Sequence, residues 1–463
     1  MKRKVSSKPT DTLLEGSVAK GLIWFAFPLF LGNLFQQLYN TADTLIVGNF
    51  LPKESLAAVS SSGNLIFMLV GFLNGIAGGA GVVIAKYFGA KDEESLSRAV
   101  HTNVAFGLAG GGLLTVVGVL LTPQILTWMG TPPDVLPESI TYFQVYFFGV
   151  MATFLYSIGA GILQAVGDSR HPLYYLIVSS VINILLDLLF VGGFGWGVAS
   201  AAAATVISQA VSAVLCLYRL LRLEKVCRVE IKKIRFHGDM FSQIIRFGLP
   251  AGVQNSVIGF ANVMVQTQIN LFDADAVAGC GSYSKVEGFV FLPVTCFAMG
   301  LATFVSQNLG AGQLERVRKG TRFGILCSVT LTEGIGVLIW LFAPFVIGLF
   351  NQDPAVIDYG TRQARTEAFF YFLMAFSHCV AGVMRGAGRA YVPMLVMLGC
   401  WCVVRVSYIL LAMQAFQDIL VVFTAYPLTW FLSSVFFLIY YLKADWIHSF
   451  EKQGKHHPKE IQP

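Results

Sequence analysis

Long apolar runs follow one another along almost the whole chain, and short polar connections separate them. A helix needs roughly 20 residues to cross the hydrocarbon core of a bilayer. Twelve runs are long enough, at residues 20–45, 54–84, 98–121, 138–163, 172–193, 197–219, 242–270, 276–306, 322–343, 360–384, 392–413 and 420–442. The pattern therefore predicts an all-α integral membrane protein with twelve transmembrane helices.

The placement of basic residues predicts the orientation of these helices. Cytoplasmic connections of membrane proteins carry an excess of lysine and arginine. If the N-terminus lies in the cytoplasm, most of the 32 Lys and Arg residues fall on the cytoplasmic side, and the exceptions are Lys53, Lys285, Arg362, Arg365 and Arg405. We therefore expect a multi-pass protein of the cell (plasma or inner) membrane with both termini in the cytoplasm.

Composition agrees with this class of protein. Hydrophobic residues make up 55% of the chain and charged residues 13%, whereas soluble proteins have about 25% charged residues. The net charge of +6 follows the orientation pattern, so we predict no nucleic-acid partner. No nucleophile–base pair or zinc-ligand spacing is visible, so we expect neither an enzyme nor a resident cofactor.

The two halves of the chain resemble each other. Residues that match at an offset of 222 are Pro28, Asn33 and Asn40 with Pro250, Asn255 and Asn262, and matches at 221 include Gly167 with Gly388 and Pro172 with Pro393. Six spans in each half make a parallel repeat, with two lobes related by a pseudo-two-fold axis along the membrane normal around a central cavity. The expected parts are an N-terminal lobe (1–220), a basic linker (221–241), a C-terminal lobe (242–445) and a polar tail (446–463).

Two acids in the N-terminal half are candidate ion-binding residues. Asp43 ends a polar stripe on one face of the first span, and Asp187 lies one helical turn after Asn183. Thr205 and Gln209 repeat that spacing in the sixth span. A charge at the bilayer centre costs roughly 2.5–3.5 kcal/mol on insertion scales, so these acids should face the protein interior. Asp43 and Asp187 would form a proton or cation site, or would be buried acids satisfied by amides and hydroxyls.

The second half lacks both acids, because Val265 and Tyr408 occupy the corresponding positions. Candidate residues of a substrate cavity are Gln36, Tyr39, Asn40, Asn262, Gln266 and Glu287. Aromatic residues such as Phe35, Tyr39, Phe154 and Tyr156 would supply cation–π contacts, or would equally well pack in the core.

Four further charged residues lie within predicted spans. Glu367 follows Arg362 and Arg365 and is expected to pair with them near the outer surface. Glu333 is expected to contact a neighbouring helix, Lys285 to line the cavity, and Arg405 to neutralise one of the acids.

Several motifs together resemble the multidrug and toxic compound extrusion (MATE) family of transporters. They are Leu38-Tyr39-Asn40-Thr41-Ala42-Asp43-Thr44, Tyr87-Phe88-Gly89-Ala90-Lys91, Gln164-Ala165-Val166-Gly167-Asp168 and Asn183-Ile184-Leu185-Leu186-Asp187. The resemblance covers roughly residues 15–445 and implies a V-shaped pair of six-helix lobes. It also implies export of cationic amphiphilic compounds in exchange for H⁺ or Na⁺.

The resemblance assigns ion coupling to Asp43, Asn183, Asp187 and Thr205, as in the DNA-damage-inducible branch of the family. If the ion is Na⁺, its ligands would be Asp43, Asn183 and Asp187. The chain departs from the branch that uses an acid in the seventh helix, where it has the amides Asn262, Gln266 and Gln268 instead.

We therefore expect a monomeric secondary-active antiporter that works by alternating access, with Pro28 as a hinge in the first helix. The alternative is a flippase for a lipid-linked precursor, from the related superfamily. Such a protein would show more cationic residues in its cavity. A sensor is a further alternative, but the tail after Leu442 is too short for an output domain.

Overall fold

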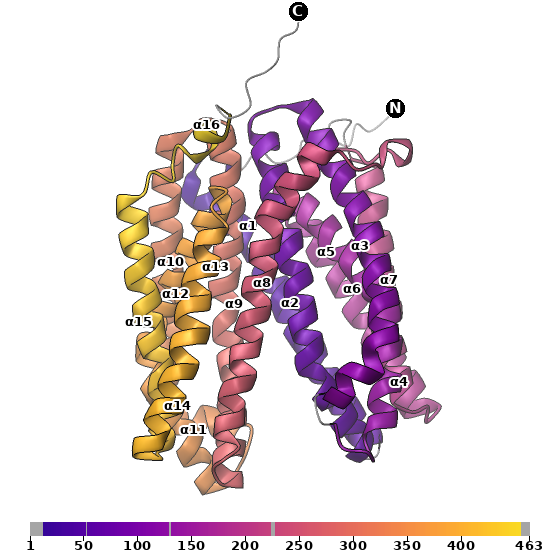
Figure 1. The fold of residues 1–463 in the computed structure, drawn as a ribbon, viewed down its shortest axis with the longest axis vertical. Helices are drawn as coiled ribbons and strands as arrows, with labels where there is room; N and C mark the ends of the chain where they lie inside the picture. The colour runs from indigo at the N-terminus through magenta and orange to yellow at the C-terminus, as the bar shows by residue number, and fades with distance from the viewer. Residues whose placement is uncertain (1–12, 52, 129–130, 224–226, 455–463) are drawn as a thin grey trace, which may run out of the picture. The chain divides into compact units, whose positions relative to one another are not determined.

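The computed structural model describes residues 13–51, 53–128, 131–223 and 227–454, and its regular elements in these ranges are helices (Figure 1). The first half contains α1 (Val18–Phe50), α2 (Lys53–Gly89), α3 (Glu93–Trp128), α4 (Leu136–Phe148), α5 (Val150–Ala165), α6 (Arg170–Asp187), the π-helix η2 (Leu188–Gly193), α7 (Val198–Leu221) and the 3-10 turn η3 (Ile231–Lys233).

The second half contains α8 (Gly238–Ile269), α9 (Ala274–Gly310), α10 (Leu314–Gly348), α11 (Pro354–Glu367), the 3-10 turn η4 (Ala368–Phe370) and α12 (Tyr371–Gly386). It continues with α13 (Tyr391–Met397), the π-helix η5 (Leu398–Val404), α14 (Arg405–Phe416), α15 (Ile419–Lys443) and α16 (Ser449–Gly454).

The twelve predicted spans all correspond to helices. In the described chain, ten helical segments are long and apolar enough to cross a membrane, and the pair α4–α5, bent by 43°, makes an eleventh. The twelfth, α8, has 32 residues but falls outside this apolar set. Its amides, among them Gln254, Asn262 and Gln266, account for the difference. The chain is a multi-pass membrane protein with the twelve-helix layout predicted from its apolar runs.

The helices group into two compact units. Unit 1 contains Phe27–Leu249, and unit 2 contains Leu13–Ala26 together with the chain from Pro250 onward. The boundaries fall inside α1 and α8, next to Pro28 and Pro250. Each of these helices therefore contributes its first part to one unit and its second part to the other. The predicted lobe boundaries at residues 220 and 242 divide the chain in sequence order. They therefore do not include this exchange of helix ends between the units.

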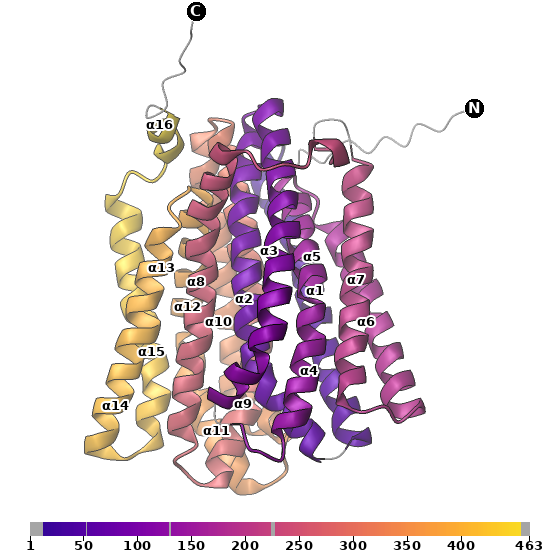
Figure 2. The same ribbon diagram turned by 45° about the vertical axis from the view of Figure 1, so that its right-hand side comes forward.

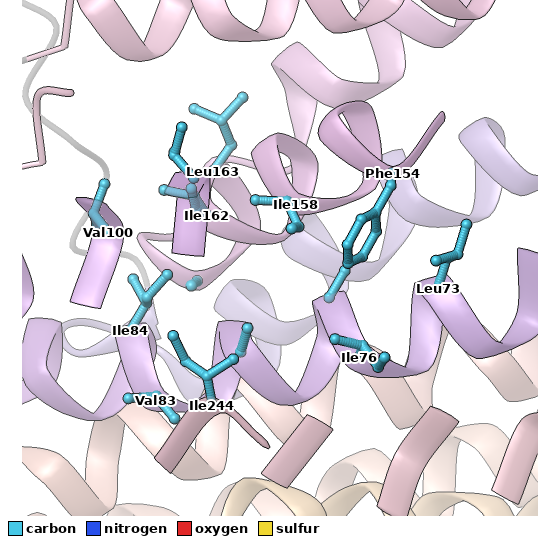
Figure 3. Close-up of a cluster of buried hydrophobic side chains, with 14 of the residues drawn as sticks. Leu73, Ile76, Val83, Ile84, Val100, Phe154, Ile158, Ile162, Leu163 and Ile244 are labelled. Atoms are coloured by element: carbon cyan, nitrogen blue, oxygen red, sulfur yellow. The ribbon is translucent and has the colours of Figure 1, made fainter. Parts of the chain in front are cut away.

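Unit 1 is held together by a large apolar core. Figure 3 shows part of it, where Ile76 and Val83 of α2, Phe154 and Ile162 of α5, and Ile244 of α8 come together. Phe154 is only 1% exposed, so it is a core residue and not a candidate for substrate contact.

Small residues let the helices of unit 1 approach closely. A Cβ atom on Gly79 of α2 would collide with the backbone of Gly248 in α8, and one on Gly81 would lie 3.3 Å from the carbonyl oxygen of Gly161 in α5. The glycine-rich stretch of α2 therefore serves helix packing.

Unit 2 is built around α9, which lies beside α10, α11 and α12 (Figures 1 and 2). A Cβ atom on Gly382 of α12 would collide with the carbonyl oxygen of Ala298 in α9. The sequence did not predict that α10 would break at Phe342 (φ −105°, ψ 18°), two residues before Pro344. The segment that precedes α1 is fixed to this unit by Arg316, whose guanidinium donates to the carbonyl oxygens of residues 13, 15 and 16 at 2.7–3.1 Å.

The linker between α7 and α8 lies against the start of α3 (Figure 2). The Glu230 backbone N–H donates to His101 Nε2 at 2.9 Å, and His237 Nδ1 lies 3.0 Å from the Thr102 hydroxyl. Arg98 forms an ion pair with Asp239 at 2.7 Å. These contacts join the linker and the beginning of α8 to unit 1.

Candidate ion and substrate sites

The two acids predicted for the N-terminal half come together inside unit 1. Asp43 is half-buried in α1, and Asp187, the last residue of α6, is fully buried. Their carboxyl groups interact with each other. The π-helix η2 begins directly after Asp187, and π-helical turns often occur at functional sites.

Several oxygen atoms around this acid pair lack a hydrogen-bond donor. They are Asp43 Oδ1, both carboxyl oxygens of Asp187, Asn183 Oδ1 and Gln209 Oε1, all of them buried. Asn183 uses its amide to donate to the Thr205 hydroxyl at 3.4 Å, and that hydroxyl donates to the carbonyl oxygen of Ala201 at 3.2 Å. Buried acceptors without donors are costly, so the cluster favours a bound proton or cation.

Among the described residues, no basic side chain compensates this pair. The sequence has no lysine or arginine between Lys20 and Lys53, or between Arg170 and Arg219, the stretches that contain the spanning parts of α1, α6 and α7. Within the described part of the chain, the electrostatic interactions of Asp43 and Asp187 accordingly involve each other and no basic side chain.

Tyrosines from α4 complete the surroundings of the acids. Tyr142 is 5% exposed and lies within electrostatic range of both Asp43 and Asp187. Tyr146, one turn later, interacts with Tyr39 of α1. Sequence reasoning missed Tyr142, because an aromatic residue within an apolar run is typical of ordinary core packing. The proximity of the Tyr142 hydroxyl to Asp187 could not be inferred without knowing where α4 lies.

The predicted substrate-cavity residues lie in both units. In unit 1 the Tyr39 hydroxyl is hydrogen-bonded to Gln36 and Gln209, and Asn40 is exposed. In unit 2, Asn262 is exposed and Gln266 donates to the Asn270 side chain at 2.9 Å. Glu287 is half-buried on α9.

The prediction that Glu367 pairs with Arg362 or Arg365 is wrong. Glu367 is fully buried and accepts hydrogen bonds from the Tyr283 hydroxyl at 3.1 Å and the Gln363 amide at 2.9 Å. Arg362 instead pairs with Asp358, one turn earlier, at 2.7 Å, and Arg365 stacks over Trp340. The acid points into unit 2, whereas both arginines lie on the exposed side of α11.

The remaining charged residues of unit 2 differ in burial. Arg405 is 1% exposed, and its guanidinium donates to the Thr429 hydroxyl. Glu333 accepts a hydrogen bond from the Phe372 backbone N–H at the start of α12, at 2.9 Å. Lys285 is exposed. In the described residues, no group of three or more His, Cys, Asp or Glu side chains is arranged to hold a metal ion.

Two repeated helical halves that cross a membrane, with two neighbouring acids inside the first, are typical of a membrane transporter of small molecules. Comparison with known proteins identifies the class more closely. The MatE family model matches the chain twice, over residues 28–189 and 250–411. The protein belongs to the MATE family of transporters, and the internal repeat inferred from the sequence coincides with these two matches.

Curated relatives align along most of their length. The probable multidrug resistance protein YoeA of Bacillus subtilis is 29% identical over 444 residues, which cover 93% of this chain and 95% of YoeA. The probable multidrug resistance protein NorM of Thermotoga maritima is 26% identical and covers 82% of each chain. The multidrug export protein MepA of Staphylococcus aureus is 23% identical, over 81% of this chain and 83% of MepA.

Solved structures share the fold. A MATE protein crystallised with MaL6 superposes with a TM-score of 0.88 at 22% identity, over 96% of this chain and all of the other. A transporter of the MOP superfamily from Pyrococcus furiosus gives the same TM-score at 21% identity, over 96% of this chain and 99% of the other. At these identities the likeness establishes the architecture alone.

Proposed function

We propose that this protein is a secondary-active antiporter that exports cationic amphiphilic compounds in exchange for H⁺ or Na⁺. The acid pair Asp43–Asp187 carries the proposal, because buried oxygens of both acids lack donors and no basic side chain of the described residues compensates them. The names of the relatives, multidrug resistance and multidrug export proteins, support the substrate class.

The exchange follows from competition for one negative site. A proton or Na⁺ that enters from outside binds between Asp43 and Asp187, with the side-chain oxygen of Asn183 as a further ligand for Na⁺. Once the charge is neutralised, the cationic substrate loses its electrostatic partner and leaves. Substrate binding from the cytoplasm favours release of the ion in turn. A ligand can drive this alternation only if its affinity differs between the two states of the transporter.

Pro28 has a structural reason to act as the hinge. It lies inside α1, at the point where the helix passes from unit 2 to unit 1. Proline removes one hydrogen bond of the helix and weakens it locally. A helix that belongs to two units must bend wherever they move, so this weak point would absorb the motion.

The remaining parts of the proposal concern location and assembly. We place the transporter in the cell membrane as a monomer with both termini in the cytoplasm. The distribution of basic residues supports the orientation of the termini.

Transport by purified protein in lipid vesicles tests the proposal. A pH gradient and a Na⁺ gradient are imposed separately, and movement of a small panel of cationic dyes is followed against their concentration gradients. We expect one of the gradients to drive transport in the native protein and neither to drive it in Asp43→Asn. Gradient-driven transport by Asp43→Asn at the native rate would refute the coupling assignment. Transport of a lipid pyrophosphate without any dye transport would favour the flippase.

A further inference from the structure

The two units differ in whether the chain supplies a cation for its own buried acids. In unit 1, no described residue supplies a cation for Asp43 and Asp187. In unit 2, Glu287 and Glu367 interact electrostatically with Arg405. The arginine is 1% exposed and lies in the middle of the span 391–416, where a charge is expensive. We therefore look for a function of Arg405 that needs its positive charge.

The guanidinium of Arg405 is held as a cation without being neutralised. Its Nε and Nη2 donate to the Thr429 hydroxyl at 3.2 and 2.9 Å. It lies 4.3 Å from the ring centre of Tyr426 and 4.9 Å from that of Trp401, and both faces attract a positive charge. Among the described residues, no carboxylate oxygen lies within 4.0 Å of a guanidinium nitrogen of Arg405, the limit for an ion pair.

Part of the wall that holds this guanidinium lies on α15, the repeat counterpart of α7, which contributes Thr205 to the ion site in unit 1. At the offset of 221, Tyr426 corresponds to Thr205 and Thr429 to Ser208, and the helices themselves begin at Ile419 and Val198, the same offset apart. The partner helix of each unit also contains a π-helical segment. Asp187 directly precedes one, and Arg405 directly follows the other.

We propose that Arg405 is a tethered cation, which occupies in unit 2 the place that the exchanged H⁺ or Na⁺ takes in unit 1. This inference rests on the proposed antiport function and refines it: the exchangeable ion binds in unit 1 only, while the acids of unit 2 are compensated by a charge that never leaves. A buried charge is tolerated when an opposite charge compensates it, and a covalently held one does so in every state of the cycle. Removal of the guanidinium should therefore open a second site for an inorganic cation beside Glu287.

The number of ions moved per substrate molecule tests whether removal of the guanidinium opens a second cation site. Vesicles that contain the native protein, Arg405→Met or Arg405→Met/Glu287→Gln are loaded with one cationic dye, and the H⁺ or Na⁺ moved per dye molecule is determined. We expect Arg405→Met to move one more cation per cycle than the native protein and the double variant to return to the native ratio. The control Arg365→Met removes an exposed arginine and should keep the native ratio. Transport by Arg405→Met at the native ratio would overturn the proposal.

A second measurement does not depend on transport. Purified variants are unfolded by heat in NaCl or choline chloride, and at several pH values, because a bound ion raises the melting temperature. Asp43→Asn should lose the shift caused by Na⁺ or acid, and Asp43→Asn/Arg405→Met should regain one. If the double variant shows no shift, the tethered cation is refuted. If Asp43→Asn alone keeps the native shift, the proposed ion site in unit 1 is what fails.

Loss of folding is also informative here. If Arg405→Met does not fold, the proposal requires Glu287→Gln or Glu367→Gln to restore folding, because either removes the charge left without compensation. Failure of both to restore it would contradict charge compensation as the role of Arg405.

Discussion

The carboxyl groups of Asp43 and Asp187 interact with each other from two different helices, although they carry the same charge when ionised. Both oxygens of Asp187 and Oδ1 of Asp43 are buried without a hydrogen-bond donor. Two buried like charges oppose folding, and a proton or cation between them removes that cost. The pair is thus an element that stability alone would not favour.

Replacing one member of the pair should therefore stabilise the protein while it removes ion coupling. In Asp187→Asn the amide supplies a donor to the carboxylate of Asp43 and eliminates the repulsion. Relative to the native protein with both acids ionised, we expect a gain of about 1–3 kcal/mol, the usual cost of an unsatisfied buried polar group. Thermal unfolding in detergent measures it. The control Asp134→Asn, at an exposed position, should show no change, and an equally large loss of stability in Asp187→Asn would contradict the prediction.

Tyr142 should contribute to ion affinity without being needed for folding. Its buried hydroxyl lies in electrostatic range of both acids. Tyr142→Phe removes one hydrogen-bonding group, worth about 0.5–1.5 kcal/mol, or roughly a two- to thirteenfold weaker ion affinity. The ion concentration that gives half-maximal dye transport would report the change. Tyr146, one turn away, interacts electrostatically with Tyr39, and Tyr146→Phe should leave that concentration nearly the same. Equal effects of the two variants would deny Tyr142 a specific role.

The sequence predicted the helices and the acid pair for the same physical reason. Bilayer thickness fixes the length of a span, and the cost of charge in lipid forces Asp43 and Asp187 inward. The spacing from Asn183 to Asp187 also depends only on helix geometry. These local rules needed no knowledge of which helices are neighbours.

What could not be predicted depends on contacts between distant segments. Glu367 follows two arginines, and this neighbourhood suggested a surface ion pair. Its actual partner, Tyr283, lies 84 residues away in the sequence. The exchange of helix halves at Pro28 and Pro250 is likewise invisible, because both helices are continuous in the apolar pattern.

At the point where α2 and α8 lie closest together, we expect that only glycine is tolerated at position 79. Gly79→Ala places a methyl group against the backbone of Gly248, which cannot move aside as a flexible side chain would. Overpacking of this kind costs about 1–3 kcal/mol. Gly78→Ala is a matched control on the same helix, because a Cβ atom there meets nothing within 4 Å. Thermal unfolding of both variants compares them, and equal melting temperatures would show that the helices can separate at no cost.

The linker should loosen as the pH falls, through His237. Burial, together with Arg235 and Arg98, holds the pKa of His237 below its ordinary value of 6.5. The neutral ring accepts a hydrogen bond from Arg235 Nε at 3.1 Å and lies against Thr102. The unfolded linker therefore binds a proton more readily than the folded one. The stability contributed by this histidine is complete above pH 6.5 and is lost as the pH falls toward the folded-state pKa.

Hydrogen exchange of residues 228–237 can follow this loosening, after correction for the intrinsic effect of pH on amide exchange. We expect a few-fold loss of protection between about pH 7.5 and about pH 5.5, on either side of the ordinary histidine pKa. His237→Gln keeps hydrogen-bonding atoms but does not titrate, so its protection should not change with pH. His448→Gln should behave as the native protein, because His448 pairs with Asp445 outside the linker. A native pH dependence in His237→Gln would assign the effect to another group, and His101, which accepts from the Glu230 backbone, would be the next to test.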